Sequence, residues 1–143
     1  MSIQDLVDDF EFLDEWEDRY RYVIELGKEL EPLSDAEHSP ENKVEGCVSQ
    51  VWLVSETRQN ASGAPIIHFR GDSDAHIVRG LVAILMRLYS DKTPKEILDI
   101  DARAIFTSLG LDEHLTPQRS NGLYSMVGRI QADAKAAAEA ASA

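Results

Sequence analysis

Cys47 is the residue whose type and position could do the most distinctive chemistry in this sequence. It is the only cysteine among 143 residues, and Gly46 precedes it where a polar loop meets a predicted strand. Glycine permits unusual backbone angles and close approach by a partner, and a loop-to-strand junction can present a side chain on a fixed support. A free cysteine is also often a small buried hydrophobic residue. The sequence context therefore makes Cys47 the candidate reactive thiol.

Several kinds of cysteine chemistry are open to a single thiol. A sulfur relay needs one nucleophilic thiolate, access, and a partner that carries a persulfide or disulfide. A cysteine-dependent hydrolase or transferase needs in addition a histidine within hydrogen-bonding reach and an oxyanion hole. The candidate histidines, none of them in a recognisable hydrolase signature, are His38, His68, His76 and His114. A non-catalytic binding module with an inert cysteine is the third interpretation, whereas a redox sensor would need a resolving cysteine that the chain lacks.

Two charged residues could support the thiol. Arg119 stands in a polar run at the start of a predicted helix, and a guanidinium beside a cysteine favours the thiolate. Arg119 could equally pair with Asp112 or Glu113, and the sequence does not decide between these arrangements. Asp74 follows Ser73, the predicted N-cap of another helix, where a carboxylate suits the positive end of the helix dipole.

The composition excludes several classes of protein. The 14 basic and 26 acidic residues give a formal net charge of −12 and a pI near 4.6, which argues against a nucleic-acid binder because phosphate neutralisation supplies most of that affinity. A single cysteine excludes a disulfide scaffold. The longest apolar run, residues 80–86, is far too short to span a membrane, and the N-terminus lacks the features of a signal peptide. We therefore expect a cytoplasmic protein with a reduced thiol.

We also expect no metal and no cofactor on this chain. One cysteine and four scattered histidines give no spacing of the zinc type, and an iron–sulfur scaffold would need several thiolates. The negative charge is concentrated in residues 1–45, which hold 15 acidic and 4 basic residues. This region is either a solvated helix face or an acidic docking surface for a basic partner.

The elements that must position these residues follow from apolar spacing and turn signals. An amphipathic helix is predicted over 12–30 after a short helical turn, with Gly27 on its apolar stripe. A hairpin follows, with strands over 48–54 and 66–70 and a turn over 58–64. Further helices are predicted to begin after Ser73, at Thr93–Pro94, after Asp101 and at Thr116–Pro117.

This order predicts an α+β fold in which helices pack on one face of a small antiparallel sheet. We expect one domain over residues 1–133. Residues 134–143 are rich in alanine and offer no apolar face to bury, so this tail is expected to fray or to be disordered.

Three stretches of the sequence resemble the SufE family: VEGCVSQVWL at 44–53, GDSDAHIVRGL at 71–81 and HLTPQRSNG at 114–122. The resemblance extends from about residue 8 to residue 132. It implies a SufE/IscU-like fold in which Cys47 accepts sulfane sulfur as a persulfide, with Gly46, Asp74 and Arg119 as supporting residues. The implied partner is a SufS- or CsdA-type cysteine desulfurase, which carries the pyridoxal phosphate and is stimulated by the transfer. The sulfur would then pass to a downstream acceptor or scaffold for iron–sulfur cluster assembly, and the family includes both monomers and homodimers.

Overall fold

The sheet of this protein is a single hairpin, in which β1 (Val51–Gln59) pairs antiparallel with β2 (Pro65–Ser73). Val51 lies opposite Ser73 at one end of the ladder, and Gln59 lies opposite Pro65 at the other. The structure is a computed structural model that describes residues 3–46 and 49–142. One face of the hairpin is buried and its other face is partly exposed. The hairpin therefore needs a layer of helices on its apolar face.

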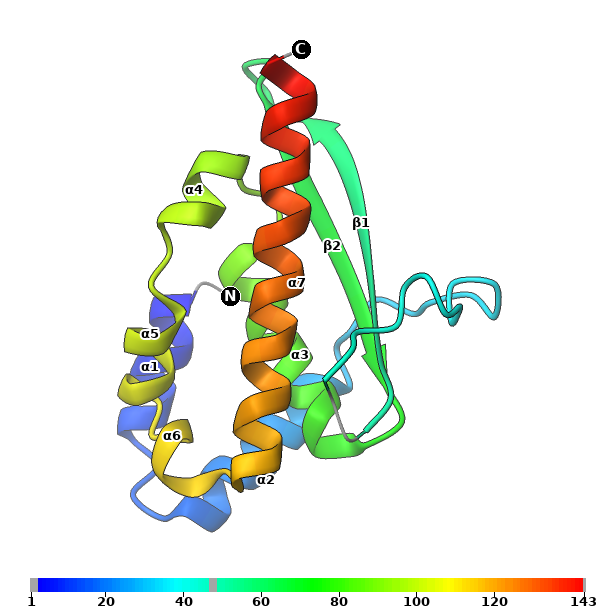
Figure 1. Ribbon diagram of the computed structural model, residues 1–143. Coiled ribbons are helices and arrows are strands. Elements are labelled where there is room, and N and C mark those ends of the chain that lie inside the picture. Colours follow the sequence, from blue (N-terminus) through cyan, green and yellow to red (C-terminus); the bar gives the residue numbers. More distant parts are fainter. Residues whose placement is uncertain (1–2, 47–48, 143) are drawn as a thin grey trace.

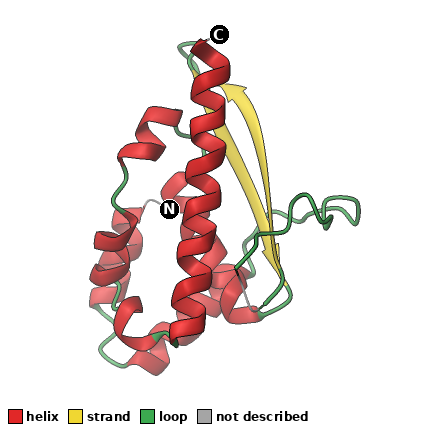
Figure 2. Cartoon of the chain, in the orientation of Figure 1, coloured by secondary structure: helices red, strands yellow, loops and turns green. Residues whose placement is uncertain are grey.

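The helices supply that layer, and Figures 1 and 2 show them gathered on one side of the hairpin. The longest helix runs beside the hairpin along most of its length (Figure 1). The helices are α1 (Ile3–Glu11), α2 (Trp16–Gly27), α3 (His76–Tyr89), α4 (Pro94–Asp99), α5 (Ala102–Ser108), α6 (Leu111–His114) and α7 (Pro117–Ser142). The predicted α+β architecture is confirmed. No helix in the described part of the chain is both long enough and apolar enough to cross a membrane.

Helix α3 is the centre of the core, because it packs against α2, β2 and α7. Its residues are buried on nearly every face, as expected for a helix enclosed on several sides. The prediction that Gly27 marks a close approach is also correct: a Cβ on Gly27 would lie 2.7 Å from the backbone nitrogen of Gly80. A Cβ on Gly80 would lie 2.0 Å from the carbonyl oxygen of Val23, so glycine on both helices lets their backbones meet.

The predicted helix starts in the second half of the chain are confirmed at three places. Thr93 accepts a hydrogen bond from the backbone N–H of Glu96, whose side chain accepts from Thr93 N–H in a capping box. Asp101 accepts from the backbone N–H of Ala104 at the start of α5. Helix α7 begins at Pro117, with its predicted inner face buried: Leu123, Met126, Val127 and Ile130.

Two helical predictions differ from the structure. The helix predicted over 12–30 is shorter, because α2 begins only at Trp16 and ends at Gly27, and the predicted helical turn before it is the nine-residue α1. The Arg19 side chain donates a 2.7 Å hydrogen bond to the Leu13 carbonyl, in the turn between the two helices. Ser73 is not an N-cap, because it is the last residue of β2 and Ala75 occupies the N-cap position of α3. The backbone N–H of Ala75 donates to Ser73 Oγ at 3.3 Å, which is a hydrogen bond before the helix and not within its first turn.

The hairpin is longer at its turn end than predicted, since β1 continues to Gln59 and β2 begins at Pro65. The alanine-rich tail is helical through Ser142 as part of α7, and Ala134 is fully buried while Ala137 packs against the core. Whether the last turns of α7 fray in solution stays a prediction.

Candidate functional site

The segment that carries Cys47 is a short loop whose two ends are joined at the base. The backbone N–H of Val44 donates to the carbonyl oxygen of Val51 at 2.8 Å, and both side chains are buried in the core. The loop between them is residues 45–50. Cys47 and Val48 lie outside the described residues, so the site is described by the residues on either side of them.

The end of the loop that leads into β1 is held by the junction between β2 and α3. Ser73 Oγ donates to the carbonyl oxygen of Gln50 at 2.7 Å, and Asp74 Oδ1 accepts from the Gln50 N–H at 3.0 Å. The backbone N–H of Asp74 also donates to the Gln50 carbonyl at 3.2 Å. Asp74 was expected to serve the helix dipole, but its side chain instead fixes the backbone three residues after Cys47. Ser73 is 5% exposed, so its hydroxyl needs the partner that Gln50 provides.

The other end of the loop requires a glycine. Gly46 has φ 89°, in the left-handed region that residues with a Cβ rarely adopt. A Cβ on this residue would also lie 2.6 Å from Ser125 Oγ on α7. Glycine is therefore required at residue 46 for two reasons, as predicted: its backbone angle lies in the left-handed region, and the residue lies in close contact with α7.

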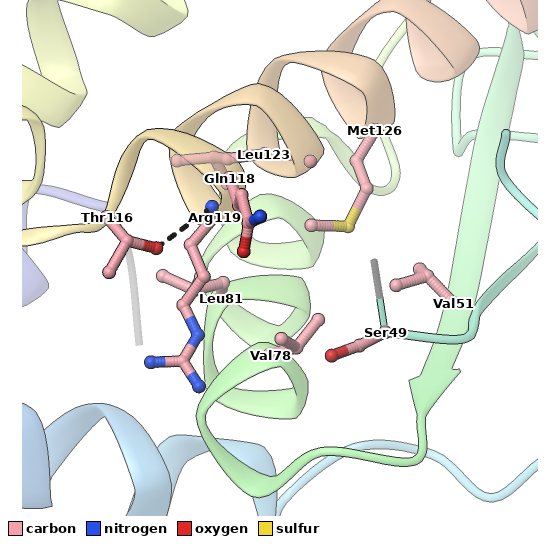
Figure 3. Close-up of a pocket in the computed structure, with 10 residues that line it drawn as sticks. Ser49, Val51, Val78, Leu81, Thr116, Gln118, Arg119, Leu123 and Met126 are labelled. Carbon is pink, nitrogen blue, oxygen red and sulfur yellow. Dashed lines mark hydrogen bonds between the residues drawn. The ribbon is translucent and has the colours of Figure 1, made fainter. Parts of the chain in front are cut away.

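A pocket of about 260 Å³ opens beside this loop, between the start of α7, the first turns of α3 and the chain that enters β1. Figure 3 shows Ser49 contributed by the chain before β1 and Arg119 contributed by the first turn of α7. Most of the lining is apolar, and its polar side chains are those of Ser49, Thr116, Gln118 and Arg119. The lining residues are Ser49, Val51, Val78, Leu81, Thr116, Gln118, Arg119, Gly122, Leu123 and Met126.

Arg119 is placed by the beginning of its helix. Its backbone N–H donates to Thr116 Oγ1 at 3.3 Å, and its side chain extends from α7 toward α3 (Figure 3). Of the alternatives left open by the sequence, an ion pair with Glu113 or any other described carboxylate does not occur; the side chain of Asp112 lies outside the described residues. Arg119 and Ser49 line the same pocket although they are far apart in sequence.

A cysteine-dependent hydrolase would need a histidine close to Cys47, so the surroundings of the four histidines bear on that interpretation. Three of them have polar or aromatic partners of their own: His38 with Asp72, His68 with Asp91 and Glu31, and His114 stacked on Trp16 with ring centroids 4.3 Å apart. His76 is exposed as the first residue of α3. No histidine is among the described residues that line the pocket beside Ser49.

The described residues include no group of three or more histidine, cysteine, aspartate or glutamate side chains that could hold a metal ion. The acidic N-terminal region has an apolar residue at its surface, since Phe12 is 86% exposed between α1 and α2. The docking role of that region stays a prediction.

Sequence reasoning missed Gln50, whose backbone Ser73 and Asp74 bind, and Ser125, which lies against Gly46. Each acts through a contact with a residue distant in the chain, and neither residue type carries a local signal of that contact.

Comparisons with known proteins agree on one family. The family model described as SufE, an Fe-S metabolism associated domain, matches residues 4–134. An uncharacterized SufE-like protein of Rhizobium etli is 58% identical over 139 residues, which cover 97% of this chain and 93% of the relative. A second uncharacterized SufE-like protein, from Rhizobium meliloti, is 55% identical over 134 residues and covers 94% of this chain and 95% of the relative.

A solved structure supports the fold alone. The solution structure of a hypothetical protein from Thermus thermophilus matches with a TM-score of 0.73 over 97% of this chain and 99% of that chain, at 19% sequence identity.

Proposed function

The chain belongs to the SufE family of Fe-S metabolism associated domains, and we propose that it accepts sulfane sulfur as a persulfide on Cys47 from a pyridoxal-phosphate-dependent cysteine desulfurase. In this proposal the chain is a sulfur carrier and not an enzyme, and it stimulates the desulfurase by removing its product. It then passes the sulfur on for iron–sulfur cluster assembly.

The proposed transfer is a thiol exchange without net oxidation. The Cys47 thiolate attacks the outer sulfur of the desulfurase persulfide, a new S–S bond forms on Cys47, and the S–S bond on the desulfurase breaks. The desulfurase cysteine leaves as a thiolate and takes up the proton that Cys47 lost. Pyridoxal phosphate acts only on the desulfurase, where it releases sulfur from L-cysteine.

The observation that carries the proposal is the pocket beside the described ends of the Cys47 loop. The Val44–Val51 hydrogen bond closes the base of this loop, and Ser73 and Asp74 hold its Gln50 end. The apolar lining beside Ser49 offers a surface on which a persulfide would be sheltered from water-borne reductants. Arg119 supplies a positive charge to the same pocket, which suits an anionic thiolate or persulfide.

The experiment is an intact-mass measurement. The purified protein is incubated with a cysteine desulfurase and L-cysteine, and its mass is taken without reductant. We expect a gain of one or more sulfur atoms that dithiothreitol removes and that the Cys47→Ser variant does not show. Cys47→Ser should keep the thermal unfolding temperature of the parent, so that a missing gain reports chemistry and not folding. A gain retained by Cys47→Ser would contradict the proposal, and so would no gain in the parent with two different active desulfurases.

A further inference from the structure

The backbone groups of the hairpin alternate between its interior and its two edges. At the turn end, Asn60 N–H donates to the Ala64 carbonyl at 2.9 Å, so the even-numbered residues of β1 direct their N–H and C=O groups toward β2. Because the direction alternates along an antiparallel strand, the odd-numbered residues of β1 direct theirs to its outer edge. The register pairs even residues with even residues, so the odd-numbered residues of β2 point to the opposite edge of the hairpin.

The outer edge of β2 is closed over most of its length. Pro65 has no N–H to offer to another strand. Ile67 exchanges hydrogen bonds of 2.7 and 3.0 Å with the backbone of residues 91–92. Ser90 Oγ accepts from Phe69 N–H at 2.9 Å and donates to the Phe69 carbonyl at 3.4 Å. A further strand therefore finds no unpaired backbone groups along this part of β2.

The outer edge of β1 is closed only at its beginning. The Val51 carbonyl accepts from Val44 N–H, and Leu53 N–H donates to the Asn42 carbonyl, both at 2.8 Å. The chain does not continue along β1 on the other side of Asn42, because Asn42 N–H donates to the Ser39 carbonyl in a turn. The cover on this edge therefore ends at Leu53.

The rest of this edge is open, and we call residues 55–59 the β1 edge. Its outward N–H and C=O groups belong to Ser55, Thr57 and Gln59, and no group in the described part of the chain hydrogen-bonds to them. The three side chains are exposed, although they share the face on which Val51 and Leu53 are buried. An unpaired strand edge is a template for another strand, and here that strand would displace no core side chain.

The charges of the β1 edge are complementary to themselves. Glu56 and Arg58 lie on the same face of β1, two residues apart. When a second copy of the strand is placed antiparallel about Thr57, each Glu56 faces the Arg58 of the other copy. A slip of two residues in either direction would instead place Glu56 opposite Glu56 or Arg58 opposite Arg58, which is unfavourable. The sequence therefore favours one register of pairing with itself.

We propose that the β1 edges of two copies of this chain pair antiparallel about a two-fold axis at Thr57, so that the two hairpins form one continuous sheet. Ser55 faces Gln59 of the second copy, Thr57 faces Thr57, and each of these facing pairs exchanges two backbone hydrogen bonds. Glu56 and Arg58 occupy the pairs between them, where side chains approach more closely. Both copies use the same surface, as a two-fold interface requires.

The charged side chains are already held in place before the copies meet. Arg58 Nη2 lies 3.1 Å from Glu56 Oε2, and Arg70 Nη2 of β2 lies 2.9 Å from Glu56 Oε1. The hydrogen bond from Arg58, followed by the one from Arg70, lowers the pKa of Glu56, so this carboxylate is ionised at neutral pH. Because the β1 edge is short, the interface is small, and we expect a dimer that dissociates on dilution.

This pairing uses a surface separate from the Cys47 loop and does not depend on the function proposed for that residue. The test is the oligomeric state of the full chain, measured by sedimentation velocity as the protein concentration is raised to about 1 mM. The mass of the parent should rise from the 15.9 kDa of one chain toward twice that value. Circular dichroism shows whether each variant used below is folded.

Two charge variants test the register. Glu56→Lys and Arg58→Glu each place like charges opposite one another across the axis, and each should raise the dissociation constant about tenfold or more. An equal mixture of the two variants should form a dimer as readily as the parent, because each then faces the opposite charge in the other. Glu113→Lys and Lys95→Glu make the same changes at exposed residues outside β1 and should dimerise as the parent does.

Two further measurements test the backbone pairing. Thr57→Pro removes an outward N–H without removing a hydrogen bond to β2, and it should abolish the dimer. Amide hydrogen exchange, followed by NMR, should become slower with rising protein concentration at Ser55, Thr57 and Gln59. The amides of Glu56 and Arg58 point toward β2 and should be protected at every concentration.

Each outcome decides the proposal. A parent that stays monomeric up to about 1 mM overturns it and leaves the β1 edge open to a strand of another protein. A dimer that persists in Thr57→Pro and in both charge variants overturns it as well, because that dimer would use another surface. A mixture of the charge variants that stays monomeric contradicts the register about Thr57. If Thr57→Pro does not fold, the charge variants and the concentration dependence of exchange decide.

Discussion

Gly46 lies directly against Ser125, so that any Cβ at residue 46 would sit 2.6 Å from the Ser125 hydroxyl oxygen. The contact joins the loop that carries Cys47 to the third turn of α7. It also coincides with a φ of 89°, so the same residue meets two requirements that only glycine satisfies.

Gly46→Ala is expected to lower the free energy of unfolding by about 2–5 kcal/mol, because it adds left-handed strain of about 1–2 kcal/mol to a steric clash of about 1–3 kcal/mol. Gly63→Ala is the matched control: Gly63 has φ 83°, but nothing lies within 4 Å of its Cβ position. That variant should lose about 1–2 kcal/mol only. Urea unfolding of both variants measures the difference, and equal losses would show that the Ser125 contact has no energetic effect.

Arg119→Ala is expected to slow sulfur acceptance about tenfold, which corresponds to about 1.4 kcal/mol, because the pocket loses its cation. Stability should change by no more than about 0.5 kcal/mol, since Arg119 is partly exposed and has no ion pair with a described carboxylate. Arg119→Lys should recover part of the rate. Arg58→Ala, which removes an exposed arginine paired with Glu56, should leave acceptance unchanged. The initial rate of mass gain distinguishes these variants, and a normal rate for Arg119→Ala would leave Arg119 a structural residue.

Asp74→Ala should free the Gln50 end of the loop, because Asp74 Oδ1 accepts from the Gln50 N–H at 3.0 Å. We expect a loss of about 1 kcal/mol in stability and faster alkylation of Cys47. Asp74→Asn keeps an acceptor oxygen and should resemble the parent. Asp101→Ala removes a helix cap at a comparable cost of about 1 kcal/mol and should leave the alkylation rate unchanged. If both alanine variants speed alkylation equally, general destabilisation and not the Gln50 contact explains the effect.

Gly80→Ala tests the closeness of α2 and α3. A Cβ on Gly80 would lie 2.0 Å from the Val23 carbonyl oxygen, so the helices must separate, and we expect a loss of about 3 kcal/mol or more. Gly128→Ala on α7 meets nothing within 4 Å and should stabilise the protein by about 0.5–1 kcal/mol through helix propensity. Thermal unfolding of the two variants should therefore shift in opposite directions. An unchanged or raised unfolding temperature for Gly80→Ala would mean that α2 and α3 have room to move apart.

The parts of the fold that could be predicted from sequence are those with local chemical signals. Thr93, Pro94 and Glu96 form the capping box that their order indicates, and Gly27 marks the helix contact that its position on an apolar stripe suggested. The extension of β1 to Gln59 was missed because its last residues are polar and exposed, and its pairing with β2 does not depend on an apolar pattern.

The site was harder to predict than the fold. Cys47, Gly46, Asp74 and Arg119 were singled out from the sequence, but the contacts of the last three depend on chain segments that folding brings together. Ser73 is an example. A serine just before a helix resembles an N-cap in the sequence, but the Ser73 hydroxyl donates to the Gln50 carbonyl and the N-cap of α3 is Ala75.

The hydrogen bond between Val44 and Val51 closes the loop that carries Cys47 at its base, so the loop can be exchanged as a unit. Because Gln50 binds Ser73 and Asp74 through its backbone, another sequence of equal length that keeps glycine at residue 46 can be inserted between the buried side chains of Val44 and Val51. Even a doubled loop would cost only about 0.6 kcal/mol in closure entropy. The scaffold thus offers an engineering position at which a peptide with a different reactive group, or a different partner specificity, can be carried on the same helices and hairpin.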